Sequence, residues 1–141
     1  MRHYLVVAHQ TLDSPQLLEA IQARMAQGPS TFHLVVPEWH PRGATWNEGQ
    51  VRLEAERRLE EARLRLVNLG VAVTGEVGHT NPVQSVANVL RRHDSEHFTE
   101  IIVSTLPQRM SRWLGLDVPT RIQKSTPVPV TAITAVESAV V

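Results

Sequence analysis

Polar and aromatic residues follow the short apolar runs of this sequence, at the positions where strands would end. Imidazoles titrate near neutral pH, and arginine binds a carboxylate or phosphate through two parallel hydrogen bonds. Because the carboxyl ends of parallel strands meet at one edge of a sheet, side chains that follow different strands can converge on a pocket for a small anion or carboxylate. The residues concerned are His9, Gln10, Trp39, His40, His79, Arg109 and Arg112, with the hydroxyls of Ser104, Thr105 and Ser111 close by in the sequence.

A plainer interpretation of the same residues stays open. Loop residues are commonly polar, and Trp39 and Trp46 can pin the long loop between them to the edge of the sheet. Strand-end position favours a ligand site, but single residues do not establish one.

Histidine also raises two metal hypotheses. His9, His40 and His79 are chemically adequate for zinc, but no tight spacing supports such a site. The string from His93 to His97 matches the H-x-x-E-H pattern of a zinc hydrolase, which requires a helix. It falls where a helix should fray, so we interpret it as a surface helix end. We predict neither a metal site nor a catalytic residue, and no Gly-x-Ser-x-Gly sequence places a serine nucleophile.

The composition narrows the class of protein. The 141 residues carry 14 lysines and arginines, 14 acidic side chains and no cysteine, which rules out disulfides, thiolate metal sites and cysteine nucleophiles. This length suits one hydrophobic core, so we expect a single domain over residues 1–141. The balanced charge gives no reason to expect nucleic acid or a membrane as a partner. The first apolar run, Tyr4–Ala8, is too short for a signal peptide or a membrane span, and we expect a cytoplasmic protein.

The elements that must position the candidate residues alternate along the chain. Helical spacing predicts helices that begin at Asp13 or Ser14, at Asn47, at Asn81 and at Asp117. Short apolar or β-branched runs predict strands at residues 4–8, 32–36, 71–77, 101–103 and 128–133. These runs are largely continuous, as in parallel strands that are covered on both faces. The alternation therefore indicates a three-layer, Rossmann-like α/β fold with an open parallel sheet and helices on both faces.

Capping signals and charge spacing sharpen two of these helices. Asp13 and Gln16 have the spacing of a capping box, and so do Asn47 and Gln50. The helix after Asn47 carries charges at neighbour spacing, with Glu54–Arg58 and Glu61–Arg65 as the expected ion pairs. We interpret this charged face as solvated and assign it no function.

Three segments of the sequence resemble the universal stress protein family. They are the stretch from Thr99 to Thr105, the stretch from Thr120 to Val130 with its Pro-x-Pro-Val ending, and the segment from Gly75 to Leu90. With the long charged helix, the resemblance covers nearly the whole chain. It implies a five-stranded parallel sheet in the order 3-2-1-4-5, a ligand crevice between the first and fourth strands, and a homodimer joined through the fifth strand.

The resemblance also identifies what is missing. ATP-binding members of that family carry an aspartate after the first strand and a Gly-x2-Gly-x9-Gly-Ser/Thr loop after the fourth. The corresponding places here hold His9 or Gln10 for the aspartate, and Ser104, Pro107 and the Leu116–Asp117 pair for the glycines. Pro107 has no amide hydrogen to donate. We expect the Asp117 carboxylate to cap the last helix and to repel phosphate, whereas Arg109 and Arg112 in the same loop would attract it.

We predict a binding or regulatory module of the universal stress protein type that does not bind ATP in the usual way and needs no cofactor. Its ligand would be a protein or a small molecule. The alternative is a nucleotide-binding stress protein for ATP or AMP, with at most slow hydrolysis, in which arginines and strand-end histidines replace the glycines. The candidate crevice comprises His9, Gln10, Trp39, His40, His79, Ser104, Thr105, Arg109, Ser111, Arg112 and Asp117.

Overall fold

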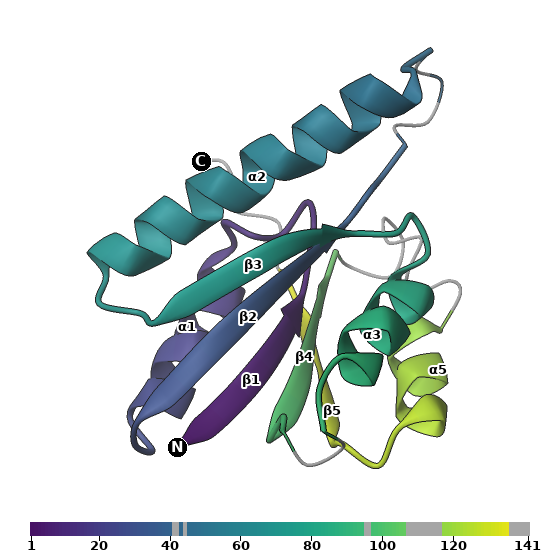
Figure 1. The fold of residues 1–141 in the computed structure, drawn as a ribbon. Coiled ribbons are helices and arrows are strands. Elements are labelled where there is room, and N and C mark those ends of the chain that lie inside the picture. The colour runs from purple at the N-terminus through teal and green to yellow at the C-terminus, as the bar shows by residue number, and fades with distance from the viewer. Residues whose placement is uncertain (41–42, 44, 95–96, 107–116, 136–141) are drawn as a thin grey trace.

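The computed structural model describes residues 1–40, 43, 45–94, 97–106 and 117–135 (Figure 1). The elements in chain order are β1 (Arg2–Val7), α1 (Pro15–Met25), β2 (Ser30–Pro37), α2 (Glu48–Asn68), β3 (Val73–Gly78), α3 (Pro82–Arg91), β4 (Glu100–Thr105), α5 (Val118–Ser125) and β5 (Val130–Thr134). All five predicted strands are present, and each begins within two residues of its expected start.

The strands form one parallel sheet in the order β3-β2-β1-β4-β5, as predicted. β1 lies in the middle and pairs with β2 on one side and β4 on the other, in the register Val7↔Val35 and Val7↔Val103. The two edges of the sheet are therefore β3 and β5. The predicted three-layer α/β fold class is confirmed.

Two apolar cores cover the two faces of the sheet. On one face, Tyr4 and Val6 of β1, with Ala8 directly after it, pack with buried residues of α1 and α2. On the other face, Leu5 and Val7 pack with the buried residues of α3 and α5. Side chains of a strand alternate between faces, so the continuous apolar run of β1 supplies both cores at once.

Local sequence explains where the helices begin. The Asn47 side chain accepts from the Gln50 amide at 2.9 Å while the Gln50 side chain accepts from the Asn47 amide at 2.9 Å, which is the predicted capping box of α2. α1 differs from the Asp13–Gln16 prediction, because Ser14 is its N-cap and accepts from the Leu17 amide at 3.2 Å. A capping hydroxyl at Ser14 places Pro15 at the first helical position, where its missing amide hydrogen costs nothing.

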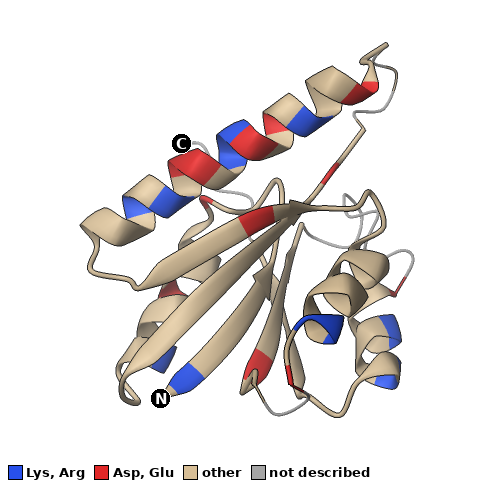
Figure 2. Cartoon of the chain, in the orientation of Figure 1, with Lys and Arg blue, Asp and Glu red and all other residues tan. Residues whose placement is uncertain are grey.

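The long helix α2 carries charges of both signs along its outer face (Figure 2). Arg58 donates to Glu54 at 2.9 Å, as predicted, but Glu61 pairs with Arg57 at 2.6 Å. The expected Glu61–Arg65 pair is wrong, because Arg65 instead donates to the Leu12 carbonyl at 2.9 Å. No helix among the described residues is long and apolar enough to cross a membrane.

Candidate functional site

The sheet has a switch point between β1 and β4. The chain leaves β1 through α1 toward β2 and later returns through α3 to β4, so the connections on the two sides of this strand pair run to opposite faces. In open parallel sheets, ligands bind beyond the carboxyl ends of the strands at such a point. The last paired residues here are Val7 and Val103, and the polar residues that follow them lie at the position where such a ligand would bind.

A buried hydrogen bond joins the two strand ends. The hydroxyl oxygens of Thr11 and Ser104 lie 2.6 Å apart, and both residues are buried. Each hydroxyl can act as donor or acceptor, so this bond ties the segment after β1 to the end of β4. Ser104, predicted as a ligand contact, therefore already has a partner within the chain.

His9 lies directly beyond β1 and is almost completely buried, with 3% of its surface exposed. Among the residues that the structure describes, neither of its ring nitrogens has a hydrogen-bond partner. Its ring centroid lies 5.6 Å from that of Trp39, which confirms that these two predicted residues come together. Burial, followed by the positive charge of Arg58, lowers the pKa of His9 from 6.5 to about 4, against a smaller opposing effect of Glu54.

The ring of His9 is consequently uncharged at neutral pH. A neutral imidazole carries one N–H donor and one bare nitrogen acceptor. Two unpaired polar atoms in a buried ring are costly, because each loses its hydrogen bonds to water without replacement. His9 thus holds one donor and one acceptor that the described part of the chain does not satisfy.

Thr105 supplies a third unsatisfied atom on the neighbouring strand. It is 2% exposed, and its hydroxyl oxygen Oγ1 has no hydrogen-bond partner in the described ranges. Its backbone carbonyl accepts from the Ala135 amide at 2.8 Å, which fixes the strand end in place. The unpaired hydroxyl and the unpaired imidazole therefore sit at the carboxyl ends of the two strands that flank the switch point.

The remaining predicted residues divide into three groups. Gln10 is half-buried beside His9, whereas His40 is exposed. His79 lies after β3 and lines a different hollow, between β3 and α3. Arg109, Ser111 and Arg112, together with Pro107, lie outside the described residues.

No protein-family model and no curated protein matches this sequence. Solved structures do match the fold. A universal stress protein in complex with cAMP superposes with a TM-score of 0.62 at 12% identity, over 96% of this chain and 98% of that chain. A protein of the universal stress protein family from Burkholderia pseudomallei gives a TM-score of 0.56 at 18% identity, over 93% of this chain and 94% of that one. This chain has the universal stress protein fold.

Within that fold, Asp117 occupies the place where ATP-binding members have a glycine, and its geometry corrects our prediction. Asp117 is the N-cap residue of α5, as expected, but its side chain makes no capping hydrogen bond. Its backbone lies in the left-handed region, with φ of 55° and ψ of 45°, whereas a side chain that caps a helix normally belongs to an extended residue. The idea that a carboxylate occupies the phosphate position by capping the helix is therefore wrong.

The left-handed backbone at Asp117 is the conformation that glycine adopts most readily. Asp117 is the one non-glycine residue with positive φ among the described residues. Asp117 thus has a backbone conformation that is typical of glycine. Aspartate is among the few residues that tolerate this region.

The metal hypotheses find no support in the described part of the chain. No group of three or more histidine or acidic residues there is arranged to hold a metal ion. His9, His40 and His79 are not brought together as such a group among those residues. His93 and His97 lie beyond the end of α3 and stack on one another with ring centroids 4.5 Å apart, and Glu96 of the H-x-x-E-H pattern lies outside the described residues.

Two contributors to the crevice escaped the sequence analysis. Thr11 carries no motif, and only the close approach of β1 and β4 shows that it bonds to Ser104. Arg58 belongs to the face of α2 that we interpreted as purely solvated, yet its charge reaches His9 and helps to lower the pKa of that imidazole. Neither interaction can be predicted from local sequence, because the two partners are far apart along the chain.

Proposed function

We propose that this chain is a small-ligand-binding module that holds an uncharged polar group at the switch point between β1 and β4. The observation that carries the proposal is the unpaired ring of His9. Its donor and its acceptor are buried beside Trp39 and point in divergent directions from the ring, so a polar group such as an amide or a heterocyclic base can pair with one of them. A ligand that pairs with these atoms regains the hydrogen bonds that burial has removed.

The surroundings of His9 support a neutral ligand group over an anion at that position. A charged imidazole would attract an anion, but the lowered pKa of His9 keeps the ring neutral. Ser104 is bonded to Thr11, so part of its hydrogen-bonding capacity is already used within the chain. The aromatic ring of Trp39 adds an apolar wall of the kind on which planar groups stack.

A nucleotide is the second candidate, and two observations favour it. One neighbour in structure is a universal stress protein in complex with cAMP. The start of α5 has a left-handed N-cap and no capping side chain, so amides there are not satisfied by Asp117. In this alternative, the base of the nucleotide forms a hydrogen bond with His9, and Arg109 and Arg112 bind the phosphate.

Native mass spectrometry and thermal shift separate the two candidates. The purified protein is compared with and without adenosine, AMP, cAMP and ATP, because a ligand that binds only the folded state raises its stability. Stabilisation by adenosine at least as large as that by ATP, lost in His9→Leu, supports the first proposal. Stabilisation by ATP alone, lost in Arg112→Ala, supports the second.

The control is His40→Leu, which removes an exposed imidazole and should leave every response unchanged. If no member of the panel binds, and the protein as purified carries no bound molecule, neither a nucleoside nor a nucleotide is the ligand. If binding occurs but His9→Leu retains it fully, the proposed role of His9 is wrong.

A further inference from the structure

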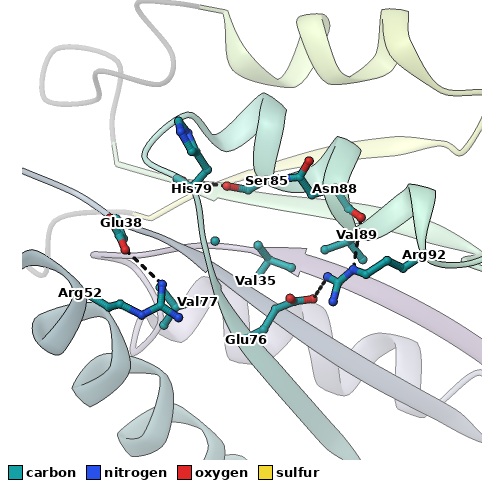
Figure 3. Close-up of a pocket in the computed structure, with 11 residues that line it drawn as sticks. Val35, Glu38, Arg52, Glu76, Val77, His79, Ser85, Asn88, Val89 and Arg92 are labelled. Carbon is teal, nitrogen blue, oxygen red and sulfur yellow. Dashed lines mark hydrogen bonds and ion pairs between the residues drawn. The ribbon is translucent and has the colours of Figure 1, made fainter. Parts of the chain in front are cut away.

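A second hollow lies between β3 and α3, away from the switch point (Figure 3). Its volume is about 400 Å³, within the range of sites for small molecules. Its lining comes from α2, from the ends of β2 and β3, and from α3, and it includes neither His9, Ser104 nor Thr105. The residues that line it are Val35, Glu38, Arg52, Glu76, Val77, Gly78, His79, Ser85, Asn88, Val89 and Arg92, and we call it the β3–α3 groove.

Charges of both signs face the β3–α3 groove in equal number. Arg52 pairs with Glu38 at 3.3 Å, and Arg92 pairs with Glu76. The arginine side chains are 55% and 56% exposed, whereas the two carboxylates are 23% and 29% exposed. A ligand of one sign would therefore meet two like charges in the groove, and only a molecule with both signs matches it.

The two carboxylates differ in how many hydrogen bonds they already accept. Oε1 of Glu76 accepts from His33 at 2.8 Å and also from Arg92. Glu38 accepts one bond from Arg52, at the long distance of 3.3 Å. Because a 3.3 Å contact is weak and Arg52 is more than half exposed, Glu38 is the carboxylate that a new cation can engage at least cost.

The α3 side of the groove offers donors. The side-chain oxygen of Asn88 accepts from Gln84 at 2.8 Å and from Arg91 at 2.5 Å. The side-chain NH2 group of Asn88 takes part in neither bond and can donate to a ligand. Nδ1 of His79 accepts from the Asn81 amide at 3.0 Å, so the ring proton of His79 belongs on Nε2. With Arg92, these groups form a wall suited to a carboxylate.

The free edge of β3 adds backbone groups between the two charged walls. The backbone amide of Phe32 donates to the Ala72 carbonyl at 2.9 Å, and the backbone amide of Glu38 donates to the Gly78 carbonyl at 3.3 Å. Backbone groups of a strand point to alternate sides, so the N–H and C=O of Val77 face away from β2. No described strand pairs with β3 on that side, and an amide of a ligand can bond there as a neighbouring strand would.

We propose that the β3–α3 groove binds a small zwitterion of the dipeptide kind, with its carboxylate on Arg92 and Asn88, its ammonium group on Glu38 and its amide against Val77. Val35 and Val89 form the apolar floor beneath it. This site is separate from the crevice of the proposed function, and either can exist without the other.

The test is an NMR titration of the 15N-labelled protein with glycylglycine. Sodium acetate and methylammonium chloride, each at the same concentration, supply the two charges on separate molecules. We expect saturable shifts of the Val77, Gly78 and Asn88 backbone amides with glycylglycine and not with either single ion. Loss of one charged or amide contact in Glu38→Gln or Asn88→Ala should weaken binding about fivefold to tenfold.

Arg63→Gln is the matched control, because Arg63 lies on the same helix as Arg52 but pairs with Glu60 outside the groove. It should bind glycylglycine as the unaltered protein does. Equal shifts with acetate alone would overturn the proposal in favour of an anion site. Shifts that do not saturate, that centre on Ala8 and His9, or that persist in both groove variants would also overturn it.

Discussion

His9 is buried at the switch point of the sheet with both ring nitrogens unpaired, beside the ring of Trp39. In the absence of a ligand such a residue lowers stability, because its polar atoms have left water without gaining partners. Ligand-binding sites often retain unpaired polar groups of this kind, which lower the stability of the free protein but bind the ligand. His9 is therefore the residue at which stability and the proposed function can be measured against each other.

Acid should destabilise the protein through His9. Its pKa is about 4 in the folded state and near 6.5 when exposed, so between these values the unfolded chain binds a proton that the folded chain does not. Stability from this residue is complete above pH 6.5 and is lost as pH falls toward 4, by up to about 3 kcal/mol. Urea unfolding from pH 7 to pH 4 should show a shallower loss for His9→Leu than for the unaltered protein.

The same variant should be no less stable than the unaltered protein at pH 7, because leucine has no polar atoms to bury. His40→Leu provides the comparison at an exposed histidine and should keep the full acid sensitivity. Parallel pH profiles for His9→Leu and the unaltered protein would show that His9 is not the buried, uncharged group described above.

At the scale of elements, the start of α5 depends on a backbone conformation that its residue type disfavours. Asp117 has φ of 55° and makes no capping bond that would compensate for it. The following helix is short, with Val118 and Ile122 as its buried residues. A change at this position should therefore act on the backbone alone.

Asp117→Gly should stabilise the protein by up to about 1 kcal/mol, because glycine adopts the left-handed region without the steric cost of a Cβ atom. Asp117→Val should destabilise it by about 1–2 kcal/mol, since a β-branched residue fits this region worst. Thermal and urea unfolding of the two variants measure both effects. Destabilisation by glycine would mean that the Asp117 side chain contributes a contact.

A second element-scale feature joins three elements through one carboxylate. Arg24 of α1 donates to Glu100 of β4 in a bidentate pair, from Nε at 3.0 Å and from Nη2 at 2.9 Å. Thr131 of β5 donates to the same carboxylate. Burial raises the pKa of Glu100, but the hydrogen bonds from Arg24 and Thr131 outweigh it and hold that pKa below its usual value.

Removal of the Arg24 side chain should lower the free energy of unfolding. Both side chains of the pair are less than one-fifth exposed, so Arg24→Ala leaves a largely buried carboxylate without its cation and should cost about 2–3 kcal/mol. The double variant Arg24→Ala/Glu100→Ala should cost less than the sum of the two single variants, because it leaves no unpaired charge. A double-mutant cycle by urea unfolding measures the difference, and strict additivity would contradict the coupling.

At the scale of the whole molecule, the sheet ends in β3 and β5, and no strand among the described residues pairs with their outer edges. Exposed edges favour pairing with another chain. The resemblance to universal stress proteins implies a homodimer through the fifth strand, and this stays a prediction. β5 forms the edge beside β4, and its ladder includes the bond from the Ile101 amide to the Pro129 carbonyl at 2.8 Å.

Ala132→Pro tests that dimer. Because backbone groups alternate and Pro129 faces β4, the amide of Ala132 points to the free edge, so proline there spares the β4–β5 ladder and blocks an added strand. We expect a dimer for the unaltered protein by native mass spectrometry and a monomer for the variant, with little change in secondary structure. A variant that remains dimeric would place the interface elsewhere, and a monomeric unaltered protein would contradict the prediction outright.

The sequence determined most of the fold. Asn47 with Gln50 and Asn81 with Pro82 are local signals, and each marks a helix start where the structure has one. The continuous apolar runs predicted buried parallel strands, because side chains that alternate between two covered faces must all be apolar. The strand order came from the family resemblance and is confirmed by the pairing of β1 with β2 and β4.

Only the tertiary structure decided how the candidate residues are used. Sequence position placed His9, Trp39 and His79 alike at strand ends, yet His9 meets Trp39 whereas His79 lines the β3–α3 groove. The sequence also suggested a capping carboxylate at Asp117, and the backbone dihedrals exclude it. Local spacing sets helix and strand through contacts within a few residues. Burial, pairing and pKa arise from contacts between distant segments, such as Thr11 with Ser104 or His9 with Arg58, and these exist only once the chain has folded.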